Sequence, residues 1–164
     1  MNTPSGRRTS ASERGASAVE FGLVAPILIL MMFGIIQYGL YFFDSVNARQ
    51  GVREAARQGV VKTFPSCTGA STDWAKLKCN TTTQVGAVTG PVYVKVAAPD
   101  GWAKGKRLVV CAVVKYDAGL NFFPMPNGGY IQSKTEMSIE KDTAPSGTAA
   151  ADTLPTGQTW TWCA

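Results

Sequence analysis

The chain has 164 residues, of which 45% are hydrophobic and 16% charged, and its formal net charge is +5. This length suits one domain, or a smaller domain with appendages, and the weak, thinly spread positive charge argues against a nucleic-acid partner. The sequence contains no histidine, so it lacks the commonest general base and metal ligand. We therefore expect no enzymatic activity, no cofactor, no bound metal and no small-molecule substrate.

A basic leader is predicted for residues 1–15, where Arg7, Arg8 and Arg14 outnumber one acid, Glu13. A long uncharged run, Phe21–Phe43, follows it, and Gln37 is its one residue that is neither apolar nor small. The hydrocarbon core of a bilayer, about 30 Å thick, needs about 20 helical residues. The run exceeds the apolar region of a cleavable secretory signal, so we predict that residues 21–43 span a membrane.

The orientation of this span follows from two kinds of residue. The arginines of the leader favour a cytoplasmic N-terminus, but four basic residues also follow the span closely, so charge alone gives nearly a tie. The four cysteines all lie beyond the span, at wide spacings that favour disulfides in an oxidising compartment over a zinc site. We therefore expect the C-terminal part to lie outside the cytoplasm.

Glu20 is the unusual residue of the N-terminal region, because a carboxylate at the start of a membrane helix is costly unless it is paired. Cleavage after Gly15 would create a new amino terminus at Ala16, one helical turn before Glu20. The positive end of the helix dipole would also favour the acid there. The alternative is that Glu20 simply lies in the lipid headgroup layer, and the charge pattern leaves both interpretations open.

The segment GASAVEF (Gly15–Phe21) resembles the processing site of type IV prepilins in the tight-adherence (Flp, type IVb) branch, in which a basic leader and a G-x-x-x-x-E-F/Y motif precede a long apolar helix. The resemblance implies that a prepilin peptidase cuts after Gly15, that Ala16 becomes the first residue, and that Glu20 pairs with an amino terminus when subunits pack. Because the chain is far longer than a major Flp pilin, it resembles the TadE-like pseudopilin or minor-pilin family.

The helical pattern continues beyond the membrane span. Small and apolar residues recur on one helical face from Ala48 to Val60, so we predict one continuous helix over residues 16–61 with a membrane half and an amphipathic half. Arg49, Arg53 and Arg57 form a stripe on it, which is either a solvated face or a contact for lipid phosphates or an acidic partner subunit. The stretch NARQGVREAARQGV also resembles the corresponding segment of TadE-like proteins.

An extracytoplasmic domain is predicted for residues 62–142. A polar segment, interpreted as a loop, runs to Gln84 and contains Cys67 and Cys79, which are close enough to form a local disulfide. Three β-rich segments follow at residues 92–98, 107–116 and 130–140, and the second is apolar throughout, as in a central strand. Strands without intervening helices indicate an antiparallel sheet. The predicted fold class is α+β and pilin-like, with the long helix packed on this small sheet.

Residues 143–164 have the small, polar composition of a flexible tail, rich in Pro and Gly. The tail ends in WTWCA, and two tryptophans beside Cys163 would be unusual on a free segment. We therefore expect the end of the tail to dock on the domain, through a disulfide to Cys111.

These observations predict a single-pass subunit of the bacterial inner membrane, with a cytoplasmic N-terminus and a periplasmic or extracellular domain. Its expected partners are the membrane, a prepilin peptidase, other pilin subunits and the pilus assembly machinery. The alternative is a signal-anchored extracytoplasmic binding domain unrelated to pili, in which GASAVEF occurs by coincidence.

Overall fold

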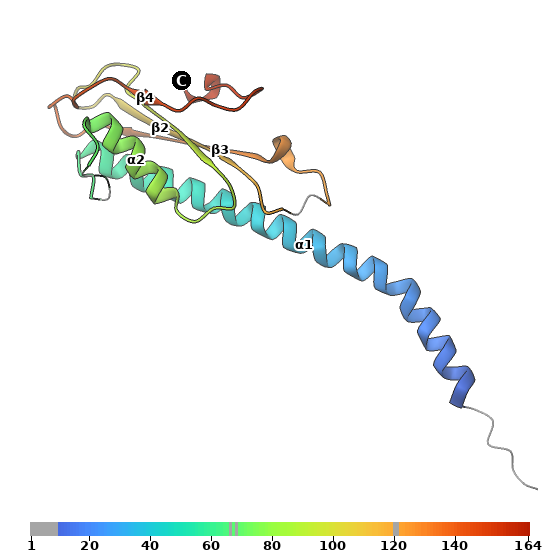
Figure 1. Ribbon diagram of the computed structural model, residues 1–164. Helices are drawn as coiled ribbons and strands as arrows, with labels where there is room; N and C mark the ends of the chain where they lie inside the picture. Colours follow the sequence, from blue (N-terminus) through green and yellow to red (C-terminus); the bar gives the residue numbers. More distant parts are fainter. Residues whose placement is uncertain (1–9, 66, 68, 120–121) are drawn as a thin grey trace, which may run out of the picture.

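The computed structural model describes the chain from Ser10 onward, except residues 66, 68, 120 and 121 and the side chains of residues 10–14. The leader arginines therefore lie outside the described residues or side chains. Two helices, α1 (Ser10–Val60) and α2 (Asp73–Val85), accompany a four-stranded sheet. Figure 1 shows a head built on the C-terminal part of α1, with the N-terminal part of this helix extending far beyond it. This confirms the predicted α+β, pilin-like fold.

Helix α1 has 51 residues and is therefore about 75 Å long, at roughly 1.5 Å per residue. Its C-terminal end agrees with the predicted boundary to within one residue, whereas at the N-terminus it extends beyond the predicted start. Pro26 lies inside the helix and removes one backbone donor there, which is a recognised cause of helix bending. The axis bends in this N-terminal part of α1 (Figure 1).

Helix α2 corrects the interpretation of residues 66–84 as a loop. Thr72 caps the helix, since its hydroxyl accepts a hydrogen bond from the backbone N–H of Ala75 at 3.2 Å. The negative charge of Asp73 in the first turn interacts favourably with the positive end of the helix dipole. The buried residues Trp74, Leu77 and Val85 lie on one face. Together with the buried Thr81 they recur every three to four residues, a spacing that the intervening polar residues conceal in the sequence.

The sheet has the strand order β3-β2-β1-β4, and all its pairings are antiparallel. Three strands confirm the three predicted segments: β1 (Val92–Ala97), β2 (Arg107–Lys115) and β3 (Tyr130–Ser138). The fourth strand, β4 (Ala150–Ala151), was not predicted. Two short 3-10 helices, η1 (Pro126–Gly129) and η2 (Thr161–Cys163), complete the described elements.

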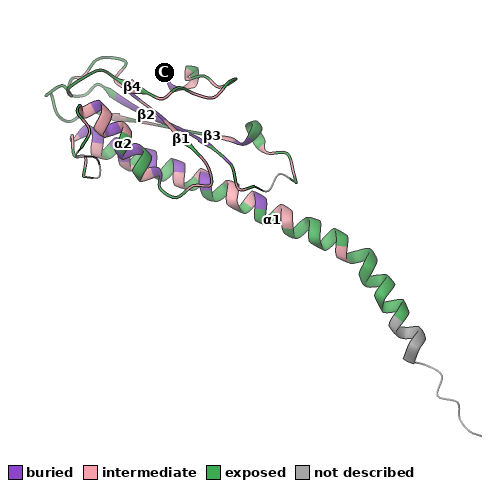
Figure 2. Cartoon of the chain, in the orientation of Figure 1, coloured by how far each residue is buried: buried purple, intermediate pink, exposed green. Residues whose placement is uncertain are grey.

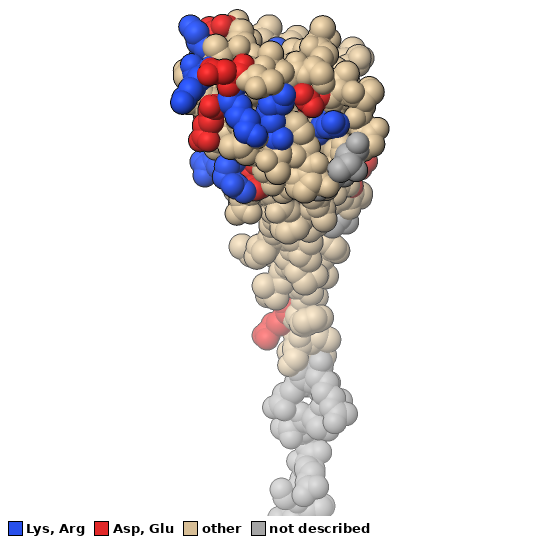
Figure 3. Space-filling view, turned by 90° about the vertical axis from the view of Figure 1, so that its left-hand side faces the viewer, with Lys and Arg blue, Asp and Glu red and all other residues tan. Residues whose placement is uncertain are grey.

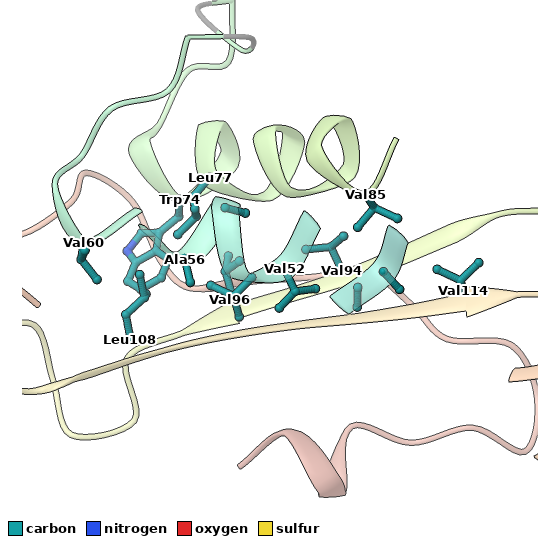
Figure 4. Close-up of a cluster of buried hydrophobic side chains, with 14 of the residues drawn as sticks. Val52, Ala56, Val60, Trp74, Leu77, Val85, Val94, Val96, Leu108 and Val114 are labelled. Atoms are coloured by element: carbon teal, nitrogen blue, oxygen red, sulfur yellow. The ribbon is translucent and has the colours of Figure 1, made fainter. Parts of the chain in front are cut away.

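The main core lies between the two helices and one face of the sheet (Figure 4). Close packing there depends on small residues of α1. A Cβ atom at Gly51 would lie 2.4 Å from the backbone of Val85, and one at Gly59 would lie 2.8 Å from Leu108. Glycine therefore lets α2 and the sheet approach the axis of α1. The core residues of α1 are Ala48, Val52, Ala55, Ala56 and Val60.

The opposite face of the sheet is covered by the C-terminal segment. Every residue of β2 between its two ends is buried, because Val110 and its alternate neighbours face the helices while Val109 and Cys111 pack with Trp160 and Trp162. The sequence of a strand that is buried on both faces is a nearly continuous apolar run. On this second face, the chain's last residues pack on Val109 and Cys111 of the predicted central strand.

The segment predicted as a flexible tail is held at several points. Its β4 pairs with β1, and the carboxylate of Asp152 accepts a hydrogen bond from Val94 N at 2.9 Å and forms an ion pair with Lys78 at 2.7 Å. The expected docking of its end is present, through the Cys111–Cys163 disulfide. The other expected disulfide, Cys67–Cys79, joins the start of the head to α2.

Candidate functional site

The N-terminal part of α1 is the most distinctive surface of the molecule. By length and composition, α1 is the helix among the described residues that could cross a membrane, and its apolar window is not buried within the protein. Figure 2 shows this part of the helix as almost entirely exposed. A soluble protein rarely leaves so large a contiguous apolar surface uncovered. Large hydrophobic residues exposed along it include Phe21, Leu23, Ile27, Leu28, Leu30, Met31 and Ile35.

The residues predicted for processing lie at the start of this surface. Gly15, Ala16, Glu20 and Phe21 are all exposed on α1, and Phe21 is 71% exposed. The structure places Ala16 and Glu20 one turn apart on the same side of the helix, as four residues of spacing require. Among the described residues, a Cβ atom at Gly15 would meet nothing within 4 Å. Packing within the chain therefore gives no reason for a glycine here, although glycine costs about 1 kcal/mol relative to alanine inside a helix.

Gln37, the polar exception in the membrane-length run, is fully buried at the junction with the head. Its amide Nε2 donates a hydrogen bond to the carbonyl oxygen of Phe123 at 2.8 Å. Its Oε1 accepts hydrogen bonds from the backbone N–H groups of Phe122 and Phe123, each at 3.2 Å. One side chain thus satisfies three backbone groups of the loop that follows β2. We refer to these three hydrogen bonds as the Gln37 clamp.

Aromatic packing accompanies the clamp. The rings of Phe33 and Phe122 stack with their centroids 5.0 Å apart, and a Cβ atom at Gly34 would lie 3.3 Å from the ring of Phe123. The hydroxyl of Tyr38 donates to the carbonyl oxygen of Pro124 at 3.1 Å. The loop is therefore fixed against α1 by both polar and apolar contacts, within the run predicted to span the membrane.

Asp44 forms a second polar junction, at the residue that ends the uncharged run. It is fully buried, and its carboxylate accepts hydrogen bonds from the backbone N–H of Thr89 at 3.1 Å and from the Thr89 hydroxyl. The same hydroxyl accepts a hydrogen bond from Asp117 N at 3.1 Å. Buried charges are tolerated when such partners satisfy them. The head is thus fastened to α1 at two levels, near Gln37 and near Asp44.

The arginine stripe does not behave as one unit. Arg57 pairs with Glu54 at 2.6 Å, and this hydrogen bond, with a second from Gln58, lowers the pKa of Glu54 to about 2. Arg49 and Arg53, in contrast, line a shallow polar hollow together with β3 residues that include Lys134. Figure 3 shows basic and acidic side chains interleaved on one face of the head, and a largely uncharged neck below it.

Sequence reasoning identified Gln37 as an exception but did not find its partner. The signal was available in part, because a lone amide in a lipid-length run must be hydrogen-bonded. Nothing in the sequence linked it to Phe122 and Phe123, which lie more than 80 residues away. Among the described residues, no group of three or more His, Cys, Asp or Glu residues is placed to hold a metal ion.

Comparison with known proteins gives one family. Residues 15–57 match the family model described as TadE-like protein. No curated protein and no solved structure gives a significant match to this chain. The matched segment begins at Gly15 and extends through both junction residues, Gln37 and Asp44, into the amphipathic half of α1. The sheet and the C-terminal segment lie outside it.

Proposed function

We propose, from its match to the TadE-like family over residues 15–57, that this protein is a membrane-anchored pilin-like subunit, a pseudopilin or minor pilin. In this proposal it takes part in assembly of a Flp-type pilus and is a substrate of a prepilin peptidase rather than a catalyst. Its partners are then the membrane, the peptidase, other pilin subunits and the assembly machinery.

The observation that carries the proposal is the position of Gly15 and Glu20 at the start of an exposed apolar helix. No described residue approaches a Cβ atom placed at Gly15, so its lack of a side chain is better explained by an external partner than by packing. A peptidase that binds the backbone closely at the cut would require a residue without a side chain there. The family match also begins at this residue.

Glu20 has a role in the same proposal. After cleavage the α-ammonium of Ala16 lies one turn before the Glu20 carboxylate and can neutralise it. A charge at membrane depth costs roughly 2.5–3.5 kcal/mol on insertion scales, so pairing favours contact with an amino terminus, either its own or that of a neighbouring subunit. Pairing between subunits would set the axial register of adjacent helices.

The disulfides and the helix support a proposed topology. Both disulfides lie in the head, which fits an oxidising compartment outside the cytoplasm. With α1 as a single-pass anchor in the bacterial inner membrane, the N-terminus is then cytoplasmic and the head periplasmic or extracellular.

Processing is tested by the intact mass of the protein purified from cells that contain the prepilin peptidase. We expect the mature wild-type chain to begin at Ala16, and Gly15→Leu to keep its leader. Gly22→Leu is the matched control, because Gly22 also lies on the exposed helix with nothing within 4 Å of a Cβ atom. A wild-type chain that keeps residues 1–15 would favour the alternative of a signal-anchored binding domain.

Subunit pairing is tested with Glu20→Gln, which leaves the apolar run and Gly15 unchanged. We expect this variant to insert and to be cleaved, but to co-purify poorly with other pilin subunits and to reduce the number of pili. Wild-type levels of both would mean that Glu20 is only a carboxylate of the headgroup layer.

A further inference from the structure

The loop that the Gln37 clamp holds lies at membrane depth if α1 spans the bilayer from Phe21. Gln37 is 16 residues beyond Phe21, or about 24 Å along the helix at 1.5 Å per residue. The hydrocarbon core is about 30 Å thick, and any tilt of α1 would place Gln37 deeper. Phe33 and Gly34, which contact the same loop, lie deeper still.

Four backbone polar groups of residues 122–124 have hydrogen bonds of the kind that this depth demands. Irregular backbone is tolerated in lipid only where its polar groups are satisfied. The clamp satisfies Phe122 N, Phe123 N and Phe123 O, and Tyr38 satisfies the carbonyl of Pro124. Pro124 and Pro126 have no backbone N–H to satisfy. This explains the buried Gln37 in an otherwise apolar run, because its side chain hydrogen-bonds the backbone groups of the loop.

The side chains of the loop continue the apolar surface of the helix. Phe122 is 58% exposed although it stacks on Phe33. Phe123 lines an open apolar groove with α1 residues that include Ile27, Leu30 and Ile35. The sequence carries no charged residue from 118 to 133 or from 21 to 43, so the loop and the helix present one uncharged surface. In Figure 1 the connection between β2 and β3 approaches α1 at the lower edge of the head.

We propose that residues 122–125 (Phe122, Phe123, Pro124 and Met125) form a second membrane-contacting element, which enters the outer leaflet beside α1 with lipid acyl chains as its partner. The proposal rests on the membrane anchoring proposed above. Acyl chains are favoured because the groove is continuous with the lipid-facing side of α1, and because neither wall carries a charge to select a protein partner. The head is then held at a fixed height and orientation on the membrane by two elements, this loop and α1, rather than by α1 alone.

The depth of the loop is measured by tryptophan quenching. Full-length Phe122→Trp protein is reconstituted at low density in phosphatidylcholine vesicles whose acyl chains carry bromine, which quenches tryptophan on contact. The four native tryptophans belong to the head: Trp74, Trp102, Trp160 and Trp162. We expect the added residue to be quenched at least twofold more than one in the matched control Phe64→Trp, because Phe64 follows the far end of α1. If Phe122→Trp fails to fold, Met125→Trp reports on the same loop.

The outcomes separate this proposal from the anchor itself. A protein that does not float with the vesicles would refute the anchoring. One that floats while position 122 is quenched no more than position 64 would refute the loop proposal and leave the anchor standing. Quenching that decreases as protein density rises, together with cross-linked dimers, would show that a second copy covers the groove instead. Adding Gln37→Leu to Phe122→Trp should at least halve the quenching, because the freed backbone groups would leave the lipid.

Discussion

The two halves of α1 differ in how their apolar character relates to their burial. The N-terminal half is the more apolar, yet its large side chains, such as Leu23 and Ile35, are 70% and 74% exposed. The C-terminal half carries several charges and smaller residues, yet Val52, Ala55 and Ala56 are completely buried. One continuous helix therefore has an exposed apolar half and a half that packs against the head. Apolar character predicts contact with lipid in the first half, whereas the spacing of small residues predicts contact with protein in the second.

The role of glycine shows the same contrast. At Gly51 the backbone of Val85 leaves no space for a side chain, whereas a Cβ atom at Gly22 would meet nothing within 4 Å. The first glycine is required by the head, whereas the second is approached by no other part of the described chain. Substitutions at matched residues of the two halves can therefore separate protein packing from lipid contact.

Gly51→Leu should have the largest effect, because the new side chain would overlap the backbone of α2, which cannot move aside without losing the core. Overpacking of a core typically costs about 1–3 kcal/mol and occasionally more, and contact with backbone places this site at about 3 kcal/mol or above. Chemical unfolding of the detergent-solubilised protein, followed by tryptophan fluorescence, measures the loss. Gly22→Leu should leave the free energy of unfolding unchanged, and equal losses in both variants would contradict the contrast.

An added charge should have its larger effect in the N-terminal half of α1, the reverse of the glycine substitutions. Leu28→Lys places an ammonium near the centre of the apolar half, where insertion scales assign a cost of roughly 2.5–3.5 kcal/mol. We expect the fraction of protein that resists alkaline extraction from membranes to fall sharply, while the head keeps its disulfides. Gln50→Lys is the control in the other half of α1, which carries the head, because the side chain of Gln50 is exposed there. Normal membrane retention of Leu28→Lys would argue that this half does not span the bilayer.

The same contrast explains how much could be predicted from sequence. The long helix, its small-residue face and the three main strands come from local patterns. The C-terminal end of α1 and the bounds of these strands were predicted to within one or two residues. Helix α2 was missed because its apolar residues are few among polar ones, although Thr72 followed by Asp73 is a helix-start signal. Strand β4 was missed because two alanines carry no strand pattern and are placed by pairing with β1.

The candidate site divides in the same way. The sequence motif placed Gly15 and Glu20 at the start of the helix, since a motif and its helix are contiguous. The Gln37 clamp and the contact between Asp44 and Thr89 join residues 45 or more positions apart. Such partners depend on the fold of the whole head, so the sequence could show that Gln37 needed a partner but not which residues would provide it.

The smallest expected effect concerns the solvent face of the head half. The pKa of Glu54 is lowered from 4.5 to about 2, chiefly by its hydrogen bond with Arg57. A lowered pKa means that the folded state holds the charged form, so this stabilisation is present above pH 4.5 and is lost as the pH falls from 4.5 towards 2. Because the side chains of Glu54 and Arg57 are 37% and 66% exposed, solvent screening keeps the contribution of this pair to stability small.

Glu54→Gln tests this sign directly. At pH 6 the free energy of unfolding of Glu54→Gln should be lower than that of the wild type. The difference should shrink at pH 2.5, where protonation of the Glu54 carboxylate begins to weaken its pairing with Arg57 in the wild type. Glu20→Gln is the counterpart on the membrane half, and it should leave unfolding of the head unchanged at both values, because Glu20 is exposed far from the sheet. A difference for Glu54→Gln that stays constant between pH 6 and pH 2.5 would show that Glu54 contributes through packing rather than through its charge. The solvent face of the head half would then carry no electrostatic contribution that distinguishes it from the membrane half.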